Sequence, residues 1–416
     1  MKIKSIVHCI FITLILFQSL NAQVKVRSIN SVPLEKRGLI NNPVWSLDNK
    51  TVAFEFIENR EKSMVMIYQV GSHERAKPLL KRKESSSTLF QTTGEISSRL
   101  PSWSTTDNNT LYFLYDQYRP RYIGKLDKMS FNDLPVNNDI VNKKYKNIIQ
   151  PSGISEYYPI SVDGMEYLFI KLKDSPRLIL YTYSDEDIGY DDGKEISPIQ
   201  SMVIPNLKID STEIIDSFCL FKNATKIIIC KGVDKDKIFL LGKLDVAEIE
   251  AEYHIVPVRK SKDGVLQEPS FNPANDKMIA YLEMLGNKES EIFYHLLLQR
   301  LDTSGRLDTS GNYLLTTELY RNEDSKTSKP NSTSYVWHPN GNYIFFINTD
   351  AKRKIAYVDL SDLNNLKTSI LKTDIEFAEQ LAISPNGKYL AVMTKIASET
   401  DNTDALGQLF IVELKL

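Results

Sequence analysis

The chain repeats one pattern of apolar and polar positions seven times. Each copy has an aromatic or aliphatic residue, then a short polar turn, then an apolar, β-branched or aromatic run. Clear copies are NPVWSLDNKTVAFEF (42–56), SYVWHPNGNYIFFI (334–347) and QLAISPNGKYLAVMT (380–394). A polar turn between two such runs is typical of a β-hairpin. Each copy therefore predicts two antiparallel strands.

One position in each copy, which we call the tryptophan slot, measures the period of the repeat. The slot holds Trp45, Trp103, Ile160, Leu220, Phe271, Trp337 and Ile383. The shortest step between slots runs from 337 to 383, and the longest from 271 to 337. Each interval has room for a third strand and for a more polar fourth strand. A repeat of this length predicts four-stranded units arranged around a ring.

The strands left over at the two ends of the chain predict how the ring closes. The last unit finishes with its third strand at Gly407–Leu416, and the segment Val24–Asn30 has no partner of its own. Pairing these two segments would complete the seventh unit and protect its edge. We expect an all-β fold, a seven-bladed β-propeller of four-stranded blades, with six blades as the alternative. An open sandwich of unrelated strands explains neither the spacing nor the leftover strand.

The beginning of the chain has a different pattern. Lys2 and Lys4 precede a largely apolar run (6–17), and small and polar residues follow as far as Ala22. This order is typical of a secretory signal peptide. The other interpretation, a membrane anchor, needs about 20 apolar residues. We expect residues 1–22 to be removed, residues 23–416 to form one propeller domain without a transmembrane segment, and the protein to be periplasmic or secreted.

The repeats resemble the TolB-type β-propeller repeat, a WD40-like repeat whose consensus is roughly P-x-W-S-P-D-G-K-x-I-A-F. The matching residues in the first unit are Pro43, Trp45, Ser46, Asp48, Lys50, Val52, Ala53 and Phe54. Those in the last unit are Ser384, Pro385, Gly387, Lys388, Leu390 and Ala391. The resemblance covers residues 24–416 and implies a stand-alone propeller, since the additional N-terminal domain of TolB has no counterpart. These residues make turns and pack blades, so the resemblance implies no activity.

Charge and cysteine content narrow the classes of partner. The 51 basic and 53 acidic residues give a net charge of −2. Such a balance provides no basic field for nucleic acid. Cys219 and Cys230 flank a predicted hairpin turn, and in an oxidising compartment they could form a disulfide. Two separate buried thiols are the alternative, because the geometry of a disulfide is restrictive.

Motifs for catalysis or metal binding are scarce. The sequence contains neither H-E-x-x-H nor G-x-S-x-G, so it predicts no zinc site and no serine hydrolase elbow. The acidic stretch 185–195 could bind calcium through several carboxylates. The spacing does not match an EF-hand, and a solvated acidic loop explains the stretch as well. We expect no other cofactor and no other metal.

The loops that lead into the inner strands of a propeller meet at one mouth of its channel. The candidate partner-binding residues there are Arg99, Glu156, Tyr157, Asp216, Glu268, Tyr335 and Glu379. We expect an exported, non-catalytic binding or scaffold protein of the bacterial envelope, a monomeric propeller within a complex, that engages a protein or peptide at this mouth. The alternative is a secreted carbohydrate-active enzyme, a lyase or glycosidase, that uses two of these carboxylates as acid and base.

Overall fold

A computed structural model describes most of the chain. The described residues are 24–59, 62–81, 97–116, 121–137, 140–141, 154–162, 165–172, 178–182, 201–203, 215–221, 226–231, 238–244, 251–256, 264–286, 292–301, 307–321, 335–350, 352–396 and 406–416. They form strands and one 3₁₀ turn, η1 (Phe131–Asp133). Within these ranges no helix has the length and apolar character needed to cross a bilayer. The predicted signal peptide and the acidic stretch 185–195 lie outside the described residues.

The strands of the described residues form seven antiparallel sheets, numbered here in chain order. Sheet 1 contains β2 (Leu39–Trp45), β3 (Thr51–Asn59), β4 (Lys62–Gln69) and β5 (Lys77–Pro78). Sheet 2 contains β6 (Ser97–Trp103), β7 (Leu111–Asp116) and β8 (Arg121–Leu126). Sheet 3 contains β9 (Ile154–Val162), β10 (Met165–Leu172), β11 (Leu178–Thr182) and β12 (Ser201–Val203). Sheet 4 contains β13 (Ile215–Leu220), β14 (Lys226–Lys231), β15 (Ile238–Leu244) and β16 (Ala251–Val256). Sheet 5 contains β17 (Gly264–Asn272), β18 (Asn275–Gly286), β19 (Ile292–Leu301) and β20 (Leu307–Leu319). Sheet 6 contains β21 (Tyr335–Trp337), β22 (Tyr343–Ile347), β23 (Ile355–Asp359) and β24 (Thr368–Ile370). Sheet 7 contains β25 (Ala378–Ile383), β26 (Tyr389–Ile396), β27 (Leu406–Lys415) and β1 (Lys25–Ser31).

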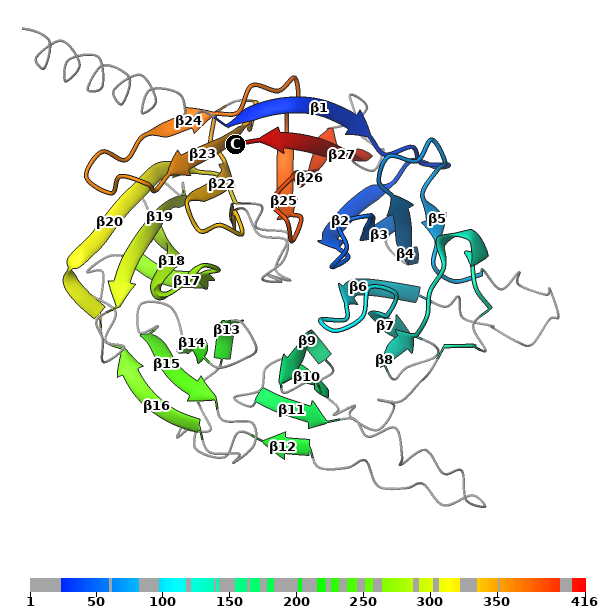
Figure 1. Cartoon of the computed structure of the whole chain (residues 1–416), viewed down its shortest axis with the longest axis horizontal. Helices are drawn as coiled ribbons and strands as arrows, with labels where there is room; N and C mark the ends of the chain where they lie inside the picture. The colour runs from blue at the N-terminus through cyan, green and yellow to red at the C-terminus, as the bar shows by residue number, and fades with distance from the viewer. Residues whose placement is uncertain are drawn as a thin grey trace, which may run out of the picture.

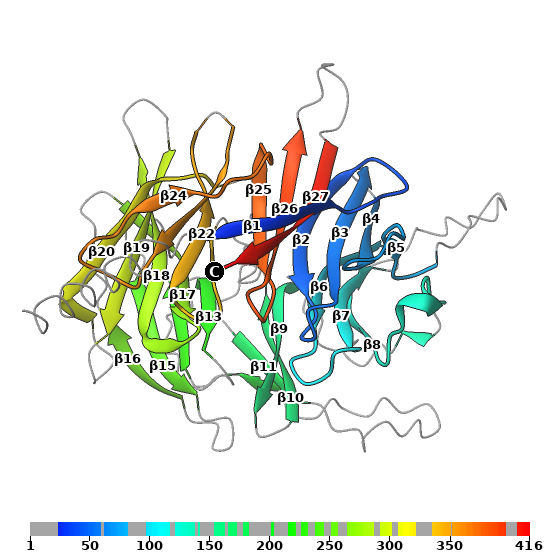
Figure 2. The same ribbon diagram turned by 45° about the horizontal axis from the view of Figure 1, so that its top comes forward.

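The sheets are arranged as in a β-propeller. Figure 1 shows them around a ring, with the first strand of each hairpin nearest the centre. Figure 2 shows the same sheets standing side by side, with β1 next to β27. The predicted all-β propeller fold is confirmed at this level. A fourth strand is also expected in the second unit, and sheet 2 has three strands among those described.

The strand predicted from the leftover segment at the beginning of the chain is β1. It pairs antiparallel with β27, with Lys25 opposite Lys415 and Ser31 opposite Phe410. β27 also pairs with β26, so strands from both ends of the chain belong to sheet 7.

In sheets 1, 6 and 7 the turn between the first and second strands contains a residue in the left-handed conformation. Gly341 and Gly387 have φ angles of +76° and +73°, and Asn49 takes the equivalent place in sheet 1 with a φ of +64°. Glycine adopts this conformation without strain, and asparagine tolerates it better than most residues. The repeated polar turn of the sequence is therefore explained by backbone conformation.

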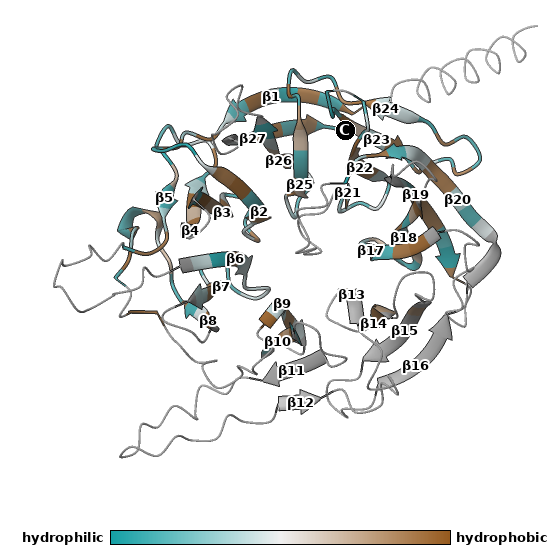
Figure 3. Ribbon diagram, turned by 180° about the vertical axis from the view of Figure 1, so that it is seen from behind, coloured by the Kyte–Doolittle hydropathy of each residue, from teal (hydrophilic) through white to brown (hydrophobic). Residues whose placement is uncertain are grey.

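The core lies in the seams between neighbouring sheets. One cluster joins Val44 and Ile67 of sheet 1 to Trp103 and Phe113 of sheet 2. Another spans sheets 5 and 6 through Leu296 and Phe346. Figure 3 shows the corresponding apolar stretches on strands such as β2 and β18. Burial of one large apolar side chain contributes about 1.5–3 kcal/mol, so the seams hold the sheets together.

Candidate functional site

Three inner strands contain a bulge three residues before the tryptophan slot. The register of β2, β6 and β17 against their neighbours shifts there. Asn42, Leu100 and Glu268 occupy this position, with φ angles of +50°, +50° and +47°. A left-handed conformation costs about 1–2 kcal/mol for a residue with a Cβ. Such residues persist only where their surroundings hold them in place.

Two buried tyrosines hold two of these bulges. The Tyr157 hydroxyl donates to the Leu100 carbonyl at 2.5 Å, and the Tyr335 hydroxyl donates to the Glu268 carbonyl at 2.5 Å. The tyrosines are 0% and 2% exposed, and burial raises the pKa of both well above the usual value. The sequence placed both residues at a partner-binding mouth. In the structure both hydroxyls bind a carbonyl of the preceding sheet, because a carbonyl displaced by a bulge requires a donor.

Glu379, one of the predicted site residues, is bound to Arg353 and Tyr320. It lies where the inner strand β25 begins, and we call this end of the channel the start end. One of its oxygens, Oε1, accepts from Arg353 Nη1, and the Tyr320 hydroxyl lies 3.2 Å from Oε2. Arg353 also donates to the Tyr320 hydroxyl at 2.7 Å and lies over its ring. The Glu379 side chain is 1% exposed. Burial raises its pKa, and the charges of Arg353 and Lys395 oppose that effect.

A second buried ion pair involves Glu268. Arg321 Nε and Nη2 both approach the same oxygen, Oε1, at 2.8 and 2.7 Å. Arg321 Nη1 donates to Gln267 Oε1 at 2.5 Å and lies 3.4 Å from the Tyr294 hydroxyl. The other carboxylate oxygen of Glu268, Oε2, is buried and has no hydrogen-bond partner in the part of the chain that the structure describes. Tyr320 and Arg321 are consecutive, so one dipeptide contacts both Glu379 and Glu268.

The remaining predicted residues are dispersed. Glu156 is 4% exposed, with Lys171 Nζ at 3.3 Å and the Tyr158 hydroxyl at 2.9 Å. Arg99 is half-buried on β6 opposite Leu114, and Asp216 lies on β13. Glu156, Glu268 and Glu379 are thus each bound to a cation from a neighbouring strand or loop. Lys171 lies directly opposite Glu156 in the hairpin of β9 and β10. Arg321 and Arg353 lie in loops, and nothing in the linear pattern marks which carboxylate each of them meets.

The other end of the channel, where the inner strands turn into the second strands, encloses a cavity of about 850 Å³. We call it the turn end. The cavity is lined by residues of six sheets, mostly apolar ones: Val44, Trp45, Leu47, Trp103, Phe218, Leu220, Pro269, Phe271, Pro273, Val336, Trp337, Pro339, Ala382, Ile383 and Pro385. Leu47 is 38% exposed, and Pro385 is exposed as well. Of the predicted site residues, Glu268 and Tyr335 line this cavity.

The tryptophan indoles fix the wall of this cavity. The Trp45 indole nitrogen donates to the Ala382 carbonyl at 3.0 Å, and that of Trp103 donates to the Val44 carbonyl at 3.3 Å. The third indole, Trp337, donates to Ser270 Oγ at 2.9 Å. Each acceptor directly precedes the tryptophan slot of the preceding inner strand. The motif residues therefore connect adjacent sheets, including sheet 7 to sheet 1, as expected for scaffold positions.

The turns at this end are also linked from sheet to sheet. His338 Nε2 lies 3.2 Å from the Gly387 carbonyl, and its Nδ1 accepts from the Asn340 amide at 3.2 Å. This arrangement requires a neutral ring with the proton on Nε2, and burial lowers the pKa of His338. In the preceding sheet Asn272 donates to the Gly341 carbonyl at 2.9 Å. The position directly after the tryptophan slot thus holds a histidine in sheet 6 and an asparagine in sheet 5.

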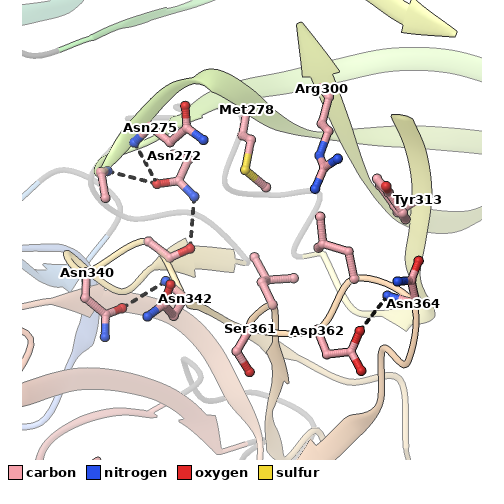
Figure 4. Close-up of a pocket in the computed structure, with 14 residues that line it drawn as sticks. Asn272, Asn275, Met278, Arg300, Tyr313, Asn340, Asn342, Ser361, Asp362 and Asn364 are labelled. Atoms are coloured by element: carbon pink, nitrogen blue, oxygen red, sulfur yellow. Dashed lines mark hydrogen bonds between the residues drawn. The ribbon is translucent and has the colours of Figure 1, made fainter. Parts of the chain in front are cut away.

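Beside Asn272, a polar pocket of about 410 Å³ lies between sheets 5 and 6 (Figure 4). Arg300 and Tyr313 lie on one side and Asp362 on the other. Several of its polar groups are used within turns: Asn272 Oδ1 accepts from Asn275 N, and Asp362 Oδ1 accepts from Asn364 N. Its amide-rich lining therefore follows from turn chemistry.

Cys219 and Cys230 are free thiols in the structure, without the disulfide that the sequence allowed. Both are buried thiols. Cys219 lies opposite Ile228 and Cys230 opposite Ser217, so the hairpin register does not set them directly across from each other. Burial raises the pKa of Cys219 to about 11. Within the described residues, no group of three histidine, cysteine, aspartate or glutamate side chains is placed to hold a metal ion.

Comparison with known proteins extends the fold assignment. No protein-family model matches the sequence, and no curated protein sequence is similar to it. The β-propeller domain of Cps50 (Swd1) from Myceliophteria thermophila is 10% identical, with a TM-score of 0.50 over 94% of this chain and 100% of that one. An oligogalacturonate lyase from Vibrio parahaemolyticus is 9% identical, with a TM-score of 0.49 over 94% of this chain and 98% of the lyase. Prolyl oligopeptidase B from Galerina marginata is 14% identical, with a TM-score of 0.46 over 92% and 47%. The likeness to the Cps50 domain supports the β-propeller fold and carries no information about activity.

Proposed function

We propose that this protein is a non-catalytic binding or scaffold protein that accepts a segment of a protein or peptide partner at the turn end of its channel. The observation that carries the proposal is the apolar cavity of about 850 Å³, lined by residues of six sheets and rimmed by exposed Leu47 and Pro385. An apolar concavity with few polar groups is the usual form of a binding site. The indole hydrogen bonds support a rigid wall, which lowers the entropy lost on binding.

The alternative, a carbohydrate-active enzyme, has less support. Acid–base chemistry on a glycan needs carboxylates that reach the substrate. Glu156 and Glu379 are buried and bound to Lys171 and Arg353. Glu268 is the one carboxylate among the described residues that line the cavity. The enzyme hypothesis predicts that sugars are released from envelope or plant glycans and that Glu268→Gln abolishes the release.

The binding proposal is tested with a photo-crosslinking residue placed at one of two exposed leucines. Leu47 lies on the cavity rim, whereas Leu314 is 51% exposed on β20, the outermost strand of sheet 5. We expect the probe at position 47, and not that at 314, to capture a defined peptide, identified by mass spectrometry. A synthetic copy of that peptide should bind the purified protein. Leu47→Asp should weaken binding by about tenfold or more, because it places a charge where apolar side chains of the partner segment are buried.

Leu314→Asp is the matched control and should leave the affinity unchanged. Two results would contradict the binding proposal. In one, position 47 captures nothing beyond what position 314 captures. In the other, the synthetic peptide binds Leu47→Asp as tightly as the unmodified protein.

The same proposal includes the number of blades, the closure of the ring and the location of the protein. We propose a TolB-type propeller of seven blades, closed by the pairing of β1 with β27, that is exported after removal of residues 1–22 and works as a monomer within an envelope complex. The pairing of β1 with β27 and the position of the motif residues in the turns support the closed ring. N-terminal sequencing of the exported protein should begin at or near Gln23, and an intact Met1 would contradict the export proposal.

A further inference from the structure

We propose that the partner segment carries a basic group on an apolar stem, and that this group binds Glu268 Oε2 inside the channel. The inference rests on the proposed function and adds to it the chemistry of the ligand. Glu268 is the only carboxylate among the described residues that line the cavity, and no described lysine, arginine or histidine lines it. An anionic ligand would find no counterion there, whereas a cation would find one acceptor.

The hydrogen bonds of Arg321 leave one oxygen of Glu268 available. Both guanidinium nitrogens that reach Glu268 converge on Oε1. A carboxylate can accept through both oxygens, yet Oε2 has no hydrogen-bond partner among the described residues, and the Glu268 side chain is 9% exposed. A buried acceptor without a donor is unfavourable, so a ligand that supplies an N–H group to Oε2 gains the missing hydrogen bond.

The backbone holds this acceptor in place. Glu268 has a φ of +47°, and its carbonyl accepts from the Tyr335 hydroxyl. Tyr335 also contacts Ser270, which in turn accepts from the Trp337 indole. The carboxylate is therefore attached to a bulge that is fixed from the next sheet, so it is preorganised for a ligand.

The surrounding side chains favour an organic cation over a hydrated metal ion. Trp45, Trp103, Trp337 and Phe271 line the same cavity. Aromatic rings attract ammonium and guanidinium groups, and apolar walls cover the methylene stem of a lysine or arginine. A slender stem is required, because the carboxylate is nine-tenths buried. The ligand chemistry is thus that of a lysine or arginine side chain with apolar neighbours.

The test compares three small probes of equal chain length: hexylammonium, hexanol and hexanoate. Their binding to the full-length protein is measured by ligand-observed NMR and calorimetry at pH 7. We expect hexylammonium to bind about tenfold more tightly than hexanoate, with hexanol in between. In Glu268→Gln, which keeps the size of the side chain and removes its charge, the preference for the cation should disappear. Glu379→Gln removes a buried carboxylate outside the cavity and is the matched control, expected to keep the preference.

A second variant covers the case in which Glu268→Gln does not fold. Ile383→Trp narrows the cavity and leaves Glu268 intact, so it should weaken hexylammonium and hexanol to the same extent. Equal or tighter binding of hexanoate, or a cation preference that persists in Glu268→Gln, would overturn the inference. So would a captured partner peptide that lacks a basic side chain. None of these results would affect the proposed binding function, which is contradicted only by the crosslinking at position 47 or by the binding of the synthetic peptide to Leu47→Asp.

Discussion

The two ends of the channel are stabilised by different forces. At the start end, Glu156 and Glu379 are buried against Lys171 and Arg353, so charge is neutralised inside the protein. At the turn end, the wall is apolar, and its hydrogen bonds run from indole nitrogens to the neighbouring strand. In the first arrangement the carboxylates are already paired with cations, so they offer a ligand few groups to bind. The second leaves an apolar lining around the cavity among the described residues, and a partner that binds there would bury it.

The largest effect is expected at the start end. Arg353→Met removes the cation from Glu379, whose side chain is 1% exposed. Leaving an unpaired charge in the interior costs about 3–5 kcal/mol. Methionine, like arginine, has a Cβ, so the left-handed backbone at this position (φ of +47°) adds no new penalty. Urea unfolding followed by circular dichroism should show this loss of stability.

Two controls accompany this variant. Lys352 is the neighbouring residue and forms an exposed pair with Glu376, so Lys352→Met should leave the unfolding midpoint unchanged. The double variant Arg353→Met/Glu379→Met replaces the pair with apolar side chains and should recover most of the lost stability. If Arg353→Met and Lys352→Met are equally stable, the start end is not held by its buried ion pair.

A smaller effect is expected in the turns of the other end. A Cβ on Gly387 would lie 2.1 Å from His338 Nε2, whereas a Cβ on Gly71 would contact nothing within 4 Å. Both glycines are left-handed, with φ angles of +73° and +80°. Gly71→Ala should therefore cost only the left-handed strain of about 1–2 kcal/mol. Gly387→Ala should cost about 1–3 kcal/mol more through overpacking. Equal melting temperatures for the two variants would show that the link between sheets 6 and 7 is unimportant.

The smallest effect is a difference in pH dependence between the two ends. The pKa of His338 is lowered by burial, so its contribution to stability is complete above its ordinary value of 6.5 and is lost as the pH falls. The pKa of Glu379 is raised by burial, so its contribution is complete below its ordinary value of 4.5 and is lost as the pH rises through the raised value. The free energy of unfolding therefore rises with pH where His338 titrates and falls with pH where Glu379 titrates.

Unfolding measured from pH 7 to pH 4 separates the two groups. His338→Asn introduces the residue that Asn272 provides at the equivalent position, so the link between turns should persist while the loss of stability on acidification becomes smaller. Glu379→Gln should instead remove the loss of stability on raising the pH above 4.5. An unchanged pH profile in His338→Asn would mean that His338 is not a titrating group of this end.

Sequence analysis predicted the features that repeat and missed those that depend on contacts across seams. The tryptophan slots, the turn at Asn49 and the strand at the beginning of the chain follow from local patterns. The bulge at Leu100 and Glu268 has no local signal, because leucine and glutamate do not favour a positive φ. The partners of Glu268 and Glu379 were also missed, since Arg321 and Arg353 lie on segments far from them in the chain.

The pairing of β1 with β27 has a consequence for how the chain folds. Residue 25 meets residue 415, so β1 receives its sheet neighbour only after the ribosome has synthesised all the sheets between β1 and β27. Until then its hydrogen-bonding edge is exposed, and sheet 7 is incomplete. Contacts of such high sequence separation slow folding and lengthen the period in which strands can pair wrongly. This protein should therefore depend on chaperones during synthesis, more than a fold whose last strand completes a local hairpin.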